Sequence, residues 1–107
     1  MAPPVAPDPG GWRPMVCLSN GDGTLPDRWF DTLYRCFVES FPTWCEVTRN
    51  EPFRGGYIIR THARELPWVQ LELSRTDRLS NTQKRMYVLK ALRRWCSEFL
   101  PTFGRAA

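Results

Sequence analysis

Few residues of this chain could carry acid–base, nucleophilic or metal chemistry. His62 is the single histidine among 107 residues, and the cysteines Cys17, Cys36, Cys45 and Cys96 form no C-x-x-C pair. This spacing matches neither a common zinc module nor a disulfide framework. Because free cysteines are commonly buried as small apolar groups, we expect four reduced, unligated thiols, no metal and no cofactor. A zinc site that uses His62, or a disulfide, is the alternative.

The carboxylates and glycine-rich segments do not strengthen the case for catalysis. Glu46 and Glu72 are placed to share the outer face of a sheet, where acidic side chains are usually solvated. The sequence contains no serine-centred nucleophile elbow and no glycine-rich phosphate loop. We therefore interpret the chain as a binding domain that is not an enzyme.

Basic residues are concentrated in the second half of the chain. Residues 1–51 hold seven acids and four bases, whereas residues 52–107 hold eleven bases and four acids. Lys84 and Lys90 are the only lysines, and the planar guanidinium of the remaining bases suits phosphate and carboxylate recognition. This balance favours a nucleic-acid partner, although a GC-rich or overprinted viral gene would enrich arginine too.

The first half of the chain predicts a strand followed by a helix. The apolar run 15–18 is typical of a short strand, and residues 19–23 form a turn cluster. Thr24 and Asp27 fit a capping box at the start of a helix that Pro42 closes. Apolar side chains recur along this helix at helical spacing: Trp29, Phe30, Leu33, Tyr34, Phe37, Val38 and Phe41.

Three short strands and a long helix are predicted to follow. Alternating residues favour strands over 44–49, 57–61 and 68–73 in an antiparallel meander. Residues 80–83 form a second capping box, from which the helix runs to a point before Pro101. The predicted fold is α+β, with two helices packed on one face of a small antiparallel sheet in the order β-α-β-β-β-α.

One domain of this size requires a single core. We expect the helices and the sheet to bury Phe30, Leu33, Phe37, Leu71, Leu89, Leu92 and Phe99. Residues 1–13 are rich in proline and glycine and predict a flexible arm, residues 14–101 the α+β domain, and residues 102–107 a short tail. The amino end lacks the pattern of a secretion signal and no apolar run suits a membrane span, so we expect a cytoplasmic or nuclear protein.

The last helix carries the clearest functional signal in the sequence. Its apolar arc leaves basic residues on the opposite side and at the amino end, where free amide groups also favour phosphate. The alternative is a solvated outer face. The candidate nucleic-acid-binding residues are Lys84, Arg85, Lys90, Arg93 and Arg94 on this helix, with Arg54 and Arg60 from the sheet loops.

The order helix, three strands, helix over residues 24–100 resembles a double-stranded-RNA-binding domain. In that family, basic residues at the start of the last helix bind phosphates across a groove, and Lys84 and Arg85 are similar to them. The resemblance implies that the first helix and the loop between the first two strands contact the adjacent minor grooves.

Two functions remain open at this point. The first is binding of structured RNA through the basic final helix. The second is a small viral or phage accessory protein that blocks a host protein through an aromatic and arginine-rich surface, because tryptophan and arginine dominate interface hot spots. A homodimer is possible in either case.

Overall fold

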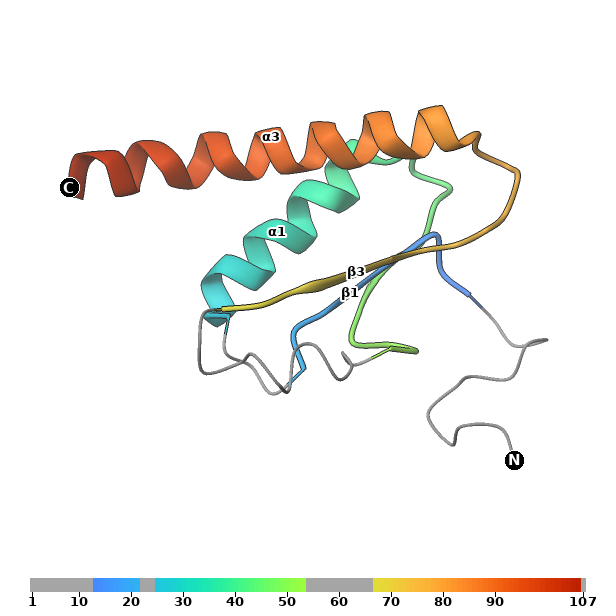
Figure 1. The fold of residues 1–107 in the computed structure, drawn as a ribbon, viewed down its shortest axis with the longest axis horizontal. Helices are drawn as coiled ribbons and strands as arrows, with labels where there is room; N and C mark the ends of the chain where they lie inside the picture. The colour runs from blue at the N-terminus through green and yellow to red at the C-terminus, as the bar shows by residue number, and fades with distance from the viewer. Residues whose placement is uncertain (1–12, 22–24, 54–66, 107) are drawn as a thin grey trace.

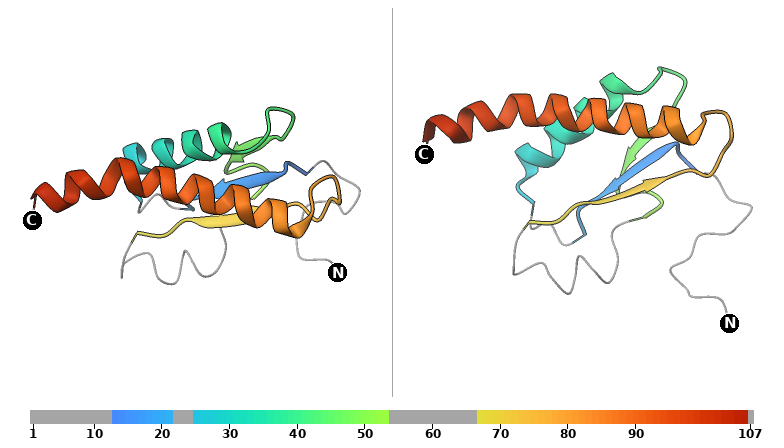
Figure 2. Two further views of the ribbon diagram at one scale, coloured as in Figure 1. Left: turned by 90° about the horizontal axis from the view of Figure 1, so that it is seen from above. Right: turned by 45° about the horizontal axis from the view of Figure 1, so that its top comes forward.

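The computed structural model describes residues 13–21, 25–53 and 67–106, which form two helices and a three-stranded sheet. The order of elements is β1 (Val16–Ser19), α1 (Asp27–Ser40), β2 (Val47–Arg49), β3 (Gln70–Leu73) and α3 (Asn81–Ala106). Figures 1 and 2 show both helices on one face of the sheet. The predicted α+β class, with two helices on one face, is therefore confirmed. The strand predicted over 57–61 lies outside the described residues, and so do residues 1–12 of the arm predicted over 1–13.

The sheet is mixed, with β1 in its centre. The strand order is β2-β1-β3, in which β1 runs parallel to β2 and antiparallel to β3. The prediction of an antiparallel meander is wrong in this respect. Helix α1 carries the chain back along the sheet between β1 and β2, and a strand that follows such a crossover enters in the same direction as the strand before it.

Local sequence sets the end of α1 and the start of α3. Helix α1 begins at Asp27 with Pro26 as N-cap and without a side-chain cap, so the predicted capping box with Thr24 as cap is wrong. Helix α1 ends where Phe41 turns to an extended conformation, as the following Pro42 requires. At the start of α3 the predicted capping box is confirmed. The amide of Gln83 donates to Ser80 Oγ at 3.0 Å, and the amide of Ser80 donates to Gln83 Oε1 at 2.9 Å.

Helix α3 does not end before Pro101, as the sequence predicted, but continues to Ala106. A proline inside a helix removes one hydrogen bond to the carbonyl four residues earlier, here that of Ser97. Ser97 lies on an exposed stretch of the helix, where water can replace the lost donor. Among the described residues no helix is both long and apolar enough to cross a membrane.

The core lies between α1, the inner face of β1 and one side of α3. Phe30, Leu33 and Phe37 are buried as predicted. However, Leu71, Leu89 and Leu92 are 37%, 46% and 37% exposed, so their predicted burial is wrong. Helix α3 turns Ala91 toward the core and packs Val88 and Trp95 against it. The apolar arc of α3 is therefore divided, and half of it is left beside the outer strand β3.

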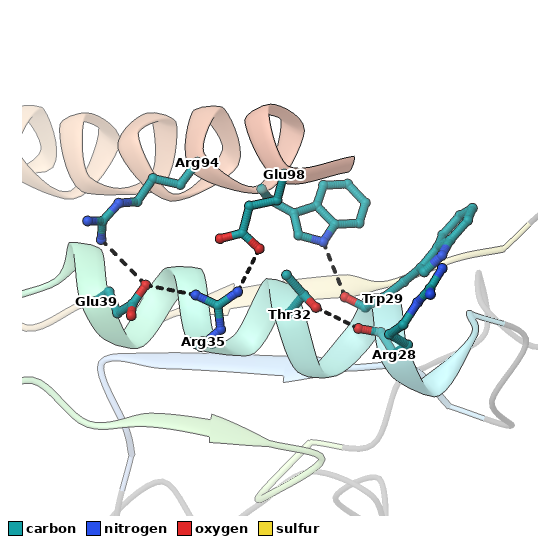
Figure 3. A network of polar contacts seen from close by, with 8 residues as sticks. Arg28, Trp29, Thr32, Arg35, Glu39, Arg94 and Glu98 are labelled. Carbon is teal, nitrogen blue, oxygen red and sulfur yellow. Dashed lines mark hydrogen bonds and ion pairs between the residues drawn. The ribbon is translucent and has the colours of Figure 1, made fainter. Parts of the chain in front are cut away.

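Polar contacts hold α3 along α1 (Figure 3). Arg35 donates to Glu98 at 2.6 Å and to Glu39 at 3.2 Å, and Arg94 lies 3.7 Å from Glu39. The hydrogen bond and the charge of Glu98 raise the pKa of Arg35. Because all four side chains are exposed, this network orients the two helices more than it stabilises them.

Aromatic rings complete the contact between the helices. The indole of Trp95 donates to the carbonyl of Trp29 at 3.2 Å. The ring of Phe99 lies 5.7 Å from that of Trp29 and 5.3 Å from that of Trp95, centroid to centroid. Phe99, predicted as a core residue, is half-buried in this aromatic cluster.

Candidate functional site

The face of the sheet that the helices leave uncovered is polar. Cys17 lies opposite Thr48 on β2 and opposite Glu72 on β3, and Ser19 lies opposite Gln70. Neighbouring residues of a strand point to opposite faces. Since Val16 and Leu18 belong to the core, these five polar side chains share the other face. Hydroxyl, thiol, amide and carboxylate groups therefore lie next to one another on one face of the sheet.

The segment after β2 folds over this polar face. Asn50 has a φ of 58°, in the left-handed region that asparagine tolerates better than most residues. Its side chain donates to Asn20 Oδ1 at 2.9 Å and accepts from the Asn20 amide at 3.1 Å. The carbonyl of Phe53 then accepts from Ser19 Oγ at 2.6 Å and from Cys17 Sγ at 3.5 Å. These bonds fix the Phe53 backbone against the sheet.

A cavity of 380 Å³ lies beside Phe53 on the helix-free face. Its described lining residues supply two guanidinium groups, one carboxylate, two hydroxyls and a buried thiol. Glu72 accepts a hydrogen bond from Gln70 Nε2 at 2.5 Å, and the guanidinium of Arg13 lies over the ring of Phe53 at 5.9 Å. The lining residues are Arg13, Pro14, Cys17, Phe53, Glu72, Leu73, Ser74, Arg75 and Thr76.

The hydroxyls in the cavity wall keep protons that they can donate. Ser74 Oγ accepts from the amide of Thr76 at 3.1 Å, and Thr76 Oγ1 accepts from the amide of Arg78 at 3.3 Å. A hydroxyl oxygen that accepts such a bond still has its own hydrogen to donate. The main chain of the same loop is held by Lys84, whose ammonium donates to the carbonyls of Ser74 at 2.9 Å and Thr76 at 2.7 Å.

This arrangement can bind an anion and move a proton. Two guanidinium groups can each form paired hydrogen bonds with a carboxylate. A half-buried carboxylate such as that of Glu72 can take a proton from water. Cys17 is 1% exposed, and its thiol donates to the Phe53 carbonyl. The thiol is therefore buried in the cavity wall and is not accessible as a nucleophile.

The structure separates the basic residues that the sequence grouped on the last helix. Lys84 is 6% exposed and holds a loop, so its ammonium does not face solvent. Arg85 lines a groove between α3 and β3. Lys90, Arg93 and Arg94 line a shallow hollow on the outer side of α3.

The remaining candidates lie outside the described residues: Arg54 and Arg60, and also His62. Among residues 13–21, 25–53 and 67–106 no three His, Cys, Asp or Glu side chains lie close enough together to hold a metal ion. Cys17, Cys36, Cys45 and Cys96 are all free thiols.

Sequence reasoning missed most of the cavity. It placed Glu72 on the outer face but paired it with Glu46, which does not line the cavity, and it gave no role to Arg13 or Arg75. The alternation of β1 and β3 could have brought Cys17 and Glu72 to one face. Nothing local indicated that Arg13 would lie beside a strand almost sixty residues later in the chain.

Comparison with known proteins identifies the family to which these residues are similar. Residues 1–77 match the family described as FGase, N-formylglutamate amidohydrolase. No curated protein and no solved structure matches the chain. The family is named for a hydrolase, so the resemblance to a double-stranded-RNA-binding domain is wrong, as is the prediction of a binding domain without enzymatic activity. The match also gives no support to a viral protein that blocks a host factor.

Proposed function

We propose, from the premise that the chain belongs to the N-formylglutamate amidohydrolase family, that its helix-free cavity binds an N-formylated acidic amino acid for hydrolysis of the formyl amide bond. One observation supports this assignment above others. Every described residue that lines the cavity, from Arg13 to Thr76, falls within the residues 1–77 that match the family. The groove between α3 and β3 and the hollow outside α3 both include residues beyond that span.

The charges of the cavity suit such a substrate. An N-formylated glutamate carries two carboxylates and no positive charge, because the formyl group removes the basicity of the amine. Arg13 and Arg75 each offer a planar set of donors that can bind one carboxylate through two hydrogen bonds. The substrate would then lie with its formyl group toward Glu72.

Hydrolysis requires a base, a place for negative charge and a proton for the leaving nitrogen. Glu72 takes a proton from a water molecule, whose oxygen attacks the formyl carbon. The hydroxyls of Ser74 and Thr76 donate to the oxygen that becomes negative. The carbon–nitrogen bond then breaks, the amine receives the proton from Glu72, and the products are formate and the free amino acid.

Formate release from N-formyl-L-glutamate, followed by proton NMR with the full chain, tests the proposal. Glu72→Gln removes the base and should lower kcat by about 100-fold or more. Glu46→Gln is the matched control, because Glu46 is an exposed carboxylate that directly precedes β2, at the opposite edge of the sheet and outside the cavity. The activity of this variant should equal that of the wild type.

The role of the arginines can be separated from that of the base. Arg75→Ala should raise KM for N-formyl-L-glutamate more than for N-formylglycine, which has one carboxylate. Absence of formate release by the wild type, or equal kcat for the Glu72→Gln and Glu46→Gln variants, would refute the proposal.

A further inference from the structure

A second groove lies on the other side of the sheet, between the outer strand β3 and helix α3. It has a volume of 650 Å³, and its apolar wall consists of Leu71, Leu73, Val88 and Leu89. Leu71 and Leu73 are 37% and 38% exposed, and Leu89 is 46% exposed. Leu92, one turn along α3 from Leu89, is also exposed. A continuous strip of aliphatic side chains at the edge of a core is typical of a surface that another chain covers.

The backbone of β3 can bind an additional strand at this edge. The amide of Ser74 donates to the carbonyl of Met15, and Cys17 lies opposite Glu72. In an antiparallel pair the residues alternate, so the N–H and C=O groups of Leu71 and Leu73 point away from β1. Within the part of the chain that the structure describes, β3 is an edge strand of the sheet. A free strand edge next to an apolar groove is the arrangement that binds extended peptides.

The charge of the groove distinguishes between possible occupants. Arg75 and Arg85 lie among its lining residues, and so does the buried Lys84, whereas no Asp or Glu of the described residues lines it. A second copy of this chain would place these arginines near those of the first copy, and like charges across an interface are unfavourable. An acidic partner would instead be attracted to the groove.

We infer that the groove binds an extended acidic segment of a partner protein, which pairs as a strand with the edge of β3 that faces away from β1. Alternate apolar side chains of that segment pack against Leu71, Leu73 and Leu89, and its carboxylates face Arg75 and Arg85. The groove shares Leu73, Ser74 and Arg75 with the cavity proposed above to bind the substrate. The inference does not rest on the hydrolytic reaction, because peptide binding is measured without formate release.

Fluorescence anisotropy with a labelled octapeptide of alternating valine and glutamate, added to the full chain, tests the inference. Leu89→Glu places a negative charge in the groove and should weaken binding by about tenfold or more. Met86→Glu is the matched control, since Met86 is a 51% exposed apolar residue on the same helix that lines the outer hollow instead. Its affinity should stay within about twofold of the wild type, because surface changes away from a contact have small effects.

Two further peptides separate the recognition of charge from the recognition of the backbone. Replacing glutamate by lysine should abolish binding, and so should N-methylation of alternate residues, which removes the amide donors needed for strand pairing. Absence of binding by the valine–glutamate peptide, or equal affinity of the Leu89→Glu and Met86→Glu variants, would overturn the inference. A dimer in sedimentation experiments that the Leu89→Glu variant abolishes would also overturn it, in favour of a second copy as the occupant.

Discussion

Replacing Lys84 of α3 with methionine removes a buried charge that holds the loop between β3 and α3. The ammonium donates to the carbonyls of Ser74 and Thr76, and hydrogen bonds to charged groups contribute about 1.5–3 kcal/mol each. Two bonds therefore contribute roughly 3–6 kcal/mol before desolvation of the ammonium, which offsets part of this gain. Methionine keeps the apolar stem but leaves both carbonyls without this donor. We expect the free energy of unfolding to fall by about 2–3 kcal/mol.

Urea unfolding followed by tryptophan fluorescence measures this change. With a slope of about 1–3 kcal/mol per molar urea, the midpoint should fall by roughly 0.7–3 M. Lys90→Met is the control, because Lys90 is exposed on the same helix and its replacement should change the free energy of unfolding by less than about 0.5 kcal/mol. Equal midpoints for the two variants would show that Lys84 does not stabilise the loop.

The thiols and the apolar arc lead to three more predictions. Exposed Cys96 should react first with a thiol reagent such as DTNB, and buried Cys36 only as the chain unfolds; simultaneous labelling in the folded protein would contradict this. Burial raises the pKa of the Cys36 thiol, so the unfolded chain ionises it at lower pH than the folded chain. The contribution of this thiol to the free energy of unfolding should therefore be constant below the ordinary thiol pKa and should decrease as the pH rises above it. Urea titrations between about pH 8 and 10 should show a smaller decrease for Cys36→Ala than for the wild type. Leu33→Ala should cost about 2–5 kcal/mol of stability, whereas Leu92→Ala, at an exposed position, should cost less than about 1.5 kcal/mol.

The parts of the fold that short-range sequence determines were predictable. Ser80 and Gln83 satisfy each other's backbone groups within one helical turn, so the start of α3 follows from four adjacent residues. Pro42 ends α1 for an equally local reason. The α+β class then follows from the two apolar helices and the short alternating strands.

Features that depend on residues far apart in the sequence were not predictable. The helical spacing of apolar residues places both Leu92 and Leu33 on an apolar helix face. This spacing does not indicate how much of each face a neighbouring element covers. A lysine on a helix is usually exposed, and only the path of residues 74–76 brings two carbonyls to Lys84. The same holds for the candidate site, where Arg13 and Glu72 line one cavity because β3 returns to pair with β1.

The central position of β1 determines when the protein can fold during its synthesis. Of the described elements β1 leaves the ribosome first, yet β1 pairs with β2 on one side and with β3 on the other. Val16 pairs with Leu73 of β3. The backbone N–H and C=O groups of β1 that face β3 therefore have no hydrogen-bond partners there until more than fifty further residues have been translated. At about 5–20 residues per second this takes several seconds. During that interval the nascent chain exposes an apolar strand whose unpaired edges can pair with other chains.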